Sequence, residues 1–190
     1  MLPKYKYLLT YRYSEMIHDL TVEFCQNFLI NFDFRRTREQ MIQAARSGKQ
    51  NIVEGVGQSR TSKKGEIKLL GVAKASLEEL LTDYEDFLRQ RKLAIWPKSD
   101  SRITVFRKKA FFLSHLSNLS HLGSLKEKPI LPQSMETAAN FLLTLCHQAT
   151  FLLDRQIKKA EEIFVNEGGY TENLFKKRLG VKIQRSNKLS

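Results

Sequence analysis

The residues best able to do chemistry in this chain are lysines and arginines, and they are concentrated in two segments. From Arg35 to Lys74 there are 10 Lys and Arg against 3 Asp and Glu, and from Tyr170 to Ser190 there are 6 against 1. The remaining residues carry equal numbers of both signs, so the formal net charge of +12 belongs entirely to these two segments. This uneven distribution predicts an anionic partner.

The first basic segment is the leading candidate for binding nucleic acid, either RNA or DNA. Cations neutralise phosphates and release condensed counterions, which makes such binding depend on salt. No base-reading pattern accompanies the cations, so we expect little sequence specificity. The alternative is a solvated charged face without a ligand. The candidate residues are Arg46, Lys49, Arg60, Lys63, Lys64 and Lys68.

The second basic segment could hold another stretch of phosphates through Lys176, Lys177 and Arg178. A mobile basic tail without a ligand explains the same residues equally well. An acidic protein surface would also complement either segment. A scaffold that docks an acidic protein partner is therefore the alternative function.

Metal binding is not expected. Glu15 and His18 have the Glu-x-x-His spacing of di-iron helical proteins, but such a site needs a second copy of the motif and two further glutamates. The sequence has no second copy, and its other histidines are scattered. We therefore predict no metal and no cofactor.

Catalysis is not expected either. Gly55-x-Gly57 followed by Lys63 superficially resembles a nucleotide-phosphate loop, but the Gly-Lys-[Ser/Thr] ending and a preceding strand are missing. Cys146 and His147 are adjacent, so they face different directions on a helix and cannot form a nucleophile pair. We therefore predict a protein that is not an enzyme.

Polar residues near the end of the second expected helix suggest a structural motif. Asn51 and Glu54 lie one turn apart, where they could bond to a neighbouring helix or to its backbone. A catalytic role for this pair is the minor alternative. The motif also includes Ser47, Gly55 and, on the following helix, Ser76.

Composition indicates a globular protein that does not span a membrane. Of the 190 residues, 42% are hydrophobic, which is enough for a core. No apolar run approaches the ~18 residues of a membrane span, and no signal peptide is evident at the start. No candidate helix joins a basic face to an obvious aromatic anchor, so no membrane partner is expected. Cys25 and Cys146 lie among apolar residues, which predicts two buried thiols and a cytoplasmic location.

Four long helices are expected to position these residues. Apolar residues recur at three- and four-residue steps, which is the period of an amphipathic helix. Short connections between such helices favour antiparallel neighbours. The expected helices cover residues 11–30, 37–57, 62–92 and 134–167.

The helix starts and one close contact are also predicted. Thr37 and Gln40 fit a capping box, while Thr61 or Ser62 could cap the third helix. Gly48 within a helix costs about 1 kcal/mol relative to Ala, so we expect it to have a packing reason. Its small-residue face, shared with Ala44 and Ala45, could serve either the core or a subunit contact.

The expected fold is therefore all-α. It is an up-down four-helix bundle with a helical insertion before the last long helix and a short basic C-terminal extension. Residues 1–169 form the bundle domain, with the insertion at about 97–132 and its helix over about 99–122. Residues 170–190 form a basic suffix, in which Gly180 stops a short helix and a mobile tail follows.

Two motifs resemble one known family. Residues 40–55, which include Ser47, Asn51 and Gly55, resemble the signature of the bacterial four-helix bundle proteins. These include proteins encoded in intervening sequences of large-subunit ribosomal RNA genes and the accessory variability protein of diversity-generating retroelements. Residues 73–80, Ala-Lys-Ala-Ser-Leu-Glu-Glu-Leu, are similar to the family's third-helix motif. Residues 86–91 and 153–172 resemble the subgroup that carries a four-helix-bundle suffix region.

The resemblance implies several properties of the protein. It implies an up-down bundle that assembles as a homo-pentamer around a central channel. It also implies nucleic-acid binding through basic surface, as part of a ribonucleoprotein, and no enzymatic activity. The insertion distinguishes this chain from the short members of the family, so it could alter the pentamer.

Overall fold

The protein is all-helical, as the sequence predicts. The computed structural model describes residues 2–186, and within them no β-strand forms apart from an isolated bridge between Leu119 and Leu125. None of the helices in these residues is long and apolar enough to cross a membrane. The α-helices are α1 (Leu9–Phe28), α2 (Arg35–Gln58), α3 (Lys63–Gln90), α4 (Ser101–Leu113), α5 (Met135–Glu167) and α6 (Tyr170–Ser186). Three 3₁₀ turns, η1 (Lys4–Tyr7), η2 (Phe32–Phe34) and η3 (Leu116–Asn118), accompany them.

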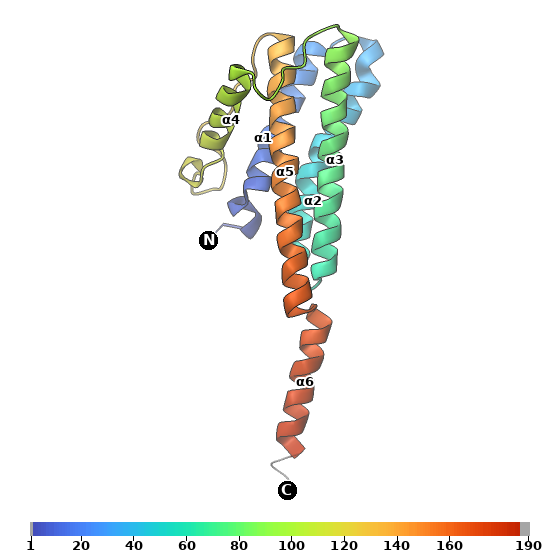
Figure 1. The fold of residues 1–190 in the computed structure, drawn as a ribbon, viewed down its shortest axis with the longest axis vertical. Helices are drawn as coiled ribbons and strands as arrows, with labels where there is room; N and C mark the ends of the chain where they lie inside the picture. The colour runs from blue at the N-terminus through green and yellow to red at the C-terminus, as the bar shows by residue number, and fades with distance from the viewer. Residues whose placement is uncertain (1, 187–190) are drawn as a thin grey trace.

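Four of these helices lie side by side along the long axis of the molecule. The chain runs up through α1, down through α2, up through α3 and down through α5 (Figure 1). Contacts join α1 to α2, α2 to α3, α3 to α5 and α5 to α1, which closes the ring of four. We call α1, α2, α3 and α5 the four-helix core. Each of them buries one apolar stripe against its neighbours, as the periodicity of the sequence predicts.

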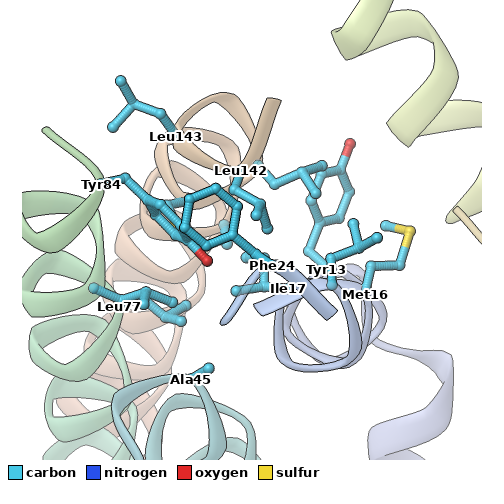
Figure 2. Close-up of a cluster of buried hydrophobic side chains, with 14 of the residues drawn as sticks. Tyr13, Met16, Ile17, Phe24, Ala45, Leu77, Tyr84, Leu142 and Leu143 are labelled. Atoms are coloured by element: carbon cyan, nitrogen blue, oxygen red, sulfur yellow. The ribbon is translucent and has the colours of Figure 1, made fainter. Parts of the chain in front are cut away.

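Aromatic and aliphatic side chains together fill the interior of the four-helix core. Figure 2 shows Tyr84 of α3 and Phe24 of α1 converging between the helices. Their ring centroids lie 5.2 Å apart at 86°, an edge-to-face arrangement that is favourable beyond simple burial. The Tyr84 hydroxyl donates a hydrogen bond of 2.9 Å to Thr21 Oγ1, which satisfies both buried polar groups.

Helices α2 and α3 approach each other closely at Gly48. A Cβ atom on Gly48 would lie 2.7 Å from Leu77 Cδ2 and 2.8 Å from Leu77 Cγ. The predicted packing reason for this glycine is therefore confirmed. Ala45 is also fully buried, and Ala44 nearly so. The small-residue face thus serves the core of this chain.

The predicted start of α2 is wrong by two residues. The helix begins at Arg35, and no side chain caps its first turn, so the capping box of Thr37 and Gln40 does not form. The 3₁₀ turn η2 leads directly into α2, which means that the chain is already helical before Thr37. Phe34 fixes this entry, because its ring packs against the core and lies 5.0 Å from the Arg91 guanidinium.

The helix in the insertion is shorter than the sequence predicts. Asp100 caps α4 by accepting a hydrogen bond of 2.9 Å from the Arg102 amide, but the helix ends at Leu113 rather than near residue 122. The following loop is tied down by the buried Asn118. Its amide donates to the carbonyls of Leu113 and Glu127, and its oxygen accepts from the Glu127 amide. These bonds stabilise the loop in place of a longer helix.

The prediction that Gly180 stops the last helix is also wrong. Helix α6 continues through Gly180 to Ser186, so much of the expected tail is helical, and residues 187–190 lie outside the described part. A single glycine costs a helix only about 1 kcal/mol, and no packing opposes its continuation here. Gly168, at φ 74°, separates α5 from α6.

Candidate nucleic-acid interface

The connection between α2 and α3 holds the first group of candidate cations. Four residues, 59–62, join the two helices. Ser62 caps α3, because its hydroxyl accepts a hydrogen bond of 3.0 Å from the Gly65 amide. This selects Ser62 over Thr61 as the predicted cap. The start of α3 therefore presents backbone N–H groups and the positive end of the helix dipole beside the basic side chains.

Three cations at this turn are exposed and unpaired. Arg60, Lys64 and Lys68 are solvent-exposed, and none of them forms an ion pair with any residue in the described range 2–186. Lys63 differs, because its Nζ lies 2.9 Å from Glu66 Oε2. Three of the four predicted residues at the turn are thus available to an anion, while Lys63 is partly neutralised. We call Arg60, Lys64 and Lys68 the turn cations.

Arg46 and Lys49 do not belong to the same cluster. Arg46 lies twelve helical residues before the end of α2 at Gln58, which corresponds to about 18 Å, and Arg60 follows in the connection. Arg46 is exposed on α2, but Lys49 turns toward α1, where its Nζ lies 3.0 Å from His18 Nδ1. The six predicted residues therefore do not form one continuous patch.

The predicted structural motif links α2 to α3. Ser47 Oγ and Ser76 Oγ lie 3.0 Å apart across the two helices. The Asn51 amide donates to the Ser47 carbonyl at 2.9 Å and to Ser47 Oγ at 3.1 Å. Gly55 is buried against α3, where a Cβ would lie at ordinary contact distance, 3.4 Å, from the Glu66 carbonyl oxygen. Glu54 is exposed and makes no such link within the described residues.

The second half of α3 is acidic and limits the basic surface. Five carboxylates occupy residues 78–86, namely Glu78, Glu79, Asp83, Glu85 and Asp86. Burial raises the pKa of Asp83 to about 6, with further contributions from the negative charges of Glu79 and Asp86. An anion therefore finds favourable charge only at the first part of α3, near the turn.

Lys74 lies between these two regions and has a structural role. Its Nζ lies 2.9 Å from Asp154 of α5 and 3.7 Å from Glu78. The hydrogen bond to Asp154 raises the pKa of Lys74, and the same bond lowers the pKa of Asp154. Lys74 thus joins α3 to α5, and we exclude it from the interface.

The second group of cations lies on α6. Lys176, Lys177 and Arg178 are all exposed, and successive residues of an α-helix point about 100° apart. The three charges therefore spread around the helix instead of forming one row. A flexible or curved polyanion could contact them, whereas a flat surface would reach only some of them.

Both groups of cations lie at the same end of the molecule. Helix α6 extends beyond the end at which α2 and α3 are joined, as Figure 1 shows. The sequence separates the two segments by about a hundred residues, and only the fold reveals that they share one end. The structure therefore places the turn cations and the α6 cations at one end of the long axis.

The rest of the described chain offers little support for other chemistry. No group of three or more His, Cys, Asp or Glu side chains able to hold a metal ion gathers in residues 2–186. Burial raises the pKa of Cys25 to about 12, and it raises that of Cys146 further, so neither thiol supplies a ready nucleophile. In comparisons with known proteins, no family model, no curated protein and no solved structure matched the chain.

Proposed function

We propose that this protein is a non-enzymatic, oligomeric accessory protein that binds RNA or DNA through its basic end. The observation that carries the proposal is the shared position of the turn cations and the α6 cations. The turn cations and the α6 cations lie at one end of the molecule, where they can contact one polyanion together (Figure 1). Contacts to phosphates, rather than to base edges, would give little sequence specificity.

The family resemblance supports this proposal and extends it. Under that resemblance the four-helix core is an up-down four-helix bundle over residues 1–169, with a suffix over residues 170–190. The protein would assemble as a homo-oligomer, with a pentamer as the specific expectation, and would act in a cytoplasmic ribonucleoprotein without a cofactor. Docking of an acidic protein partner is the competing function, since the same cations would serve it.

Fluorescence anisotropy with a labelled single-stranded RNA and a labelled DNA duplex tests the binding. We expect binding at about 0.05 M salt that weakens at least tenfold at about 0.2 M salt, as phosphate contacts require. The variant Lys64→Glu with Lys68→Glu should weaken binding by more than tenfold. Each reversed charge replaces an attraction to phosphate with a repulsion.

A matched control keeps this test specific. Lys92→Glu with Lys98→Glu makes the same change in net charge at exposed positions beyond the other end of α3. We expect this control to bind nearly as well as the original protein. Equal losses in both variants would mean that only net charge matters, and an absence of binding at low salt would refute the proposal. Co-purification of an acidic protein after nuclease treatment would favour the scaffold function instead.

A further inference from the structure

Helix α4 exposes an apolar surface that nothing in the described chain covers. Its buried side, which contains Ile103, Ala110 and Leu113, faces the four-helix core. The opposite side carries Val105, Phe111 and Phe112, which are 61%, 60% and 61% exposed. Exposed apolar groups that lie together mark a surface for a partner.

The position of α4 makes this surface accessible. Figure 1 shows α4 at the side of the molecule, apart from α2 and α3, and among the helices its main contacts are with α5. Aromatic contacts hold its inner side in place. The ring centroid of Phe106 lies 4.8 Å from that of Phe141 of α5 and 5.9 Å from that of Trp96. The helix is therefore held firmly with its apolar outer side directed away from the core.

Cations flank the apolar surface on both sides. At about 100° per residue, Phe111, Lys108, Phe112 and Val105 fall within an arc of about 120°. On the same count, Arg107 lies at one border of this arc and Lys109 lies at the other. The helix contains no Asp or Glu, and of its four cations Arg102 is paired with Asp100 at 2.8 Å. Arg107, Lys108 and Lys109 form no ion pair with a residue of the described range.

We propose that α4 binds the surface of an anionic lipid bilayer, with its axis parallel to the membrane. Phe111, Phe112 and Val105 would enter the boundary between headgroups and acyl chains, and the flanking cations would contact lipid phosphates. The long stem of Lys108 can lie along apolar groups while its charge reaches the headgroups. This is attachment to a membrane surface, which differs from the spanning helix that the sequence excludes. The proposal departs from the sequence-based expectation that no helix joins a basic face to an aromatic anchor, because Phe111 and Phe112 are exposed beside Lys108 and Lys109 on α4.

A nucleic acid fits the same surface less well. Bases stack on aromatic faces, but Phe111 and Phe112 are adjacent residues and diverge by about 100°. Val105, the third apolar side chain of the surface, offers no ring to a base. A bilayer accepts aliphatic and aromatic groups equally and supplies the negative charge that the cations require.

Co-sedimentation with vesicles tests the proposal on the full-length protein. The probes are vesicles of phosphatidylcholine with about 30% phosphatidylglycerol, and vesicles of phosphatidylcholine alone. We expect binding to the anionic vesicles only. Phe111→Ser with Phe112→Ser should lower the partition coefficient at least tenfold, because two rings no longer enter the bilayer. Lys108→Glu with Lys109→Glu should lower it to a similar extent.

The matched controls lie on α6. Leu174→Ser with Phe175→Ser also removes two adjacent exposed apolar side chains, and Lys176→Glu with Lys177→Glu reverses two adjacent exposed charges. Both controls should bind vesicles like the original protein, and circular dichroism should confirm that all variants fold. Equal losses in the α6 variants, or equal binding to both kinds of vesicle, would overturn the proposal.

Two further measurements separate the alternatives. If Phe111→Ser with Phe112→Ser lowers RNA affinity tenfold while vesicles are not bound, α4 is a nucleic-acid site and the proposal fails. If light scattering shows that the same variant loses an oligomer that the original protein forms, α4 is a contact between copies and the proposal also fails. The variant Lys64→Glu with Lys68→Glu should keep its vesicle binding, so this inference and the proposed function can fail independently.

Discussion

The close contact between α2 and α3 leads to a quantitative prediction for Gly48→Ala. A new Cβ would lie 2.7 Å from Leu77 Cδ2 and 2.8 Å from Leu77 Cγ, and Leu77 is fully buried. Leu77 must shift within a packed interior, which typically costs about 1–3 kcal/mol. Alanine is a better helix former than glycine by about 1 kcal/mol, which offsets part of this cost. We therefore expect a net loss of about 1 kcal/mol in the free energy of unfolding.

Gly71→Ala is the matched control. Gly71 lies inside α3, but a Cβ there would meet nothing within 4 Å. The same substitution should therefore stabilise the protein by about 0.5–1 kcal/mol, through helix propensity alone. Urea denaturation followed by circular dichroism, at one protein concentration, measures both changes. The two variants should differ by about 2 kcal/mol.

A double-mutant cycle tests the cause. In a Leu77→Ala background the clash is absent, so Gly48→Ala should no longer destabilise the protein. The Leu77→Ala change alone costs about 2–5 kcal/mol, which an ordinary domain tolerates. The reasoning would be refuted if Gly48→Ala stabilised the original protein as much as Gly71→Ala does, or if Leu77→Ala left the effect of Gly48→Ala unchanged.

Two other predictions concern pH and a buried amide. Because the pKa of Asp83 is raised to about 6, the folded state binds more protons than the unfolded state between about pH 4 and 6, and stability falls as the pH rises through this window. Asp83→Asn should therefore raise the free energy of unfolding at pH 7 by about 1 kcal/mol, less than the full shift implies because water screens the partly exposed carboxylate. This gain should vanish near pH 4 in thermal melts. Asn140 accepts from the Trp96 amide at 2.8 Å and donates to the Ala94 carbonyl at 2.9 Å. Asn140→Ala should cost about 2–3 kcal/mol in urea denaturation, whereas an unchanged midpoint would show that water replaces these bonds.

The helices could be predicted from the sequence because each carries one apolar stripe. Residues such as Phe24 and Leu77 recur at helical spacing, and the structure buries them. The helix ends were less predictable, since they depend on packing from distant residues. Arg91, which covers Phe34 at the start of α2, is 57 positions away in the sequence.

Among the charged residues, local contacts could likewise be predicted from the sequence and distant contacts could not. The ion pair of Lys63 with Glu66 is visible from their spacing of three, so the sequence could have identified it. The contact of Lys49 with His18 spans 31 residues and depends on how α1 meets α2. The exposed side of α4 could also have been recognised. Phe111 and Phe112 lie outside the apolar stripe that α4 buries, which the helical spacing alone predicts. Only the structure could show that no other part of the described chain covers them.

The two buried cysteines can report local opening of the protein interior. Cys25 on α1 and Cys146 on α5 are fully buried, and burial raises the pKa of both thiols. A water-soluble thiol reagent can reach neither of them until the surrounding helices separate. The rate of labelling at each position therefore measures how often that part of the interior opens, without any added probe. The labelling rates could be compared with and without RNA or vesicles. A slower rate with a ligand would show that this ligand holds the helices together.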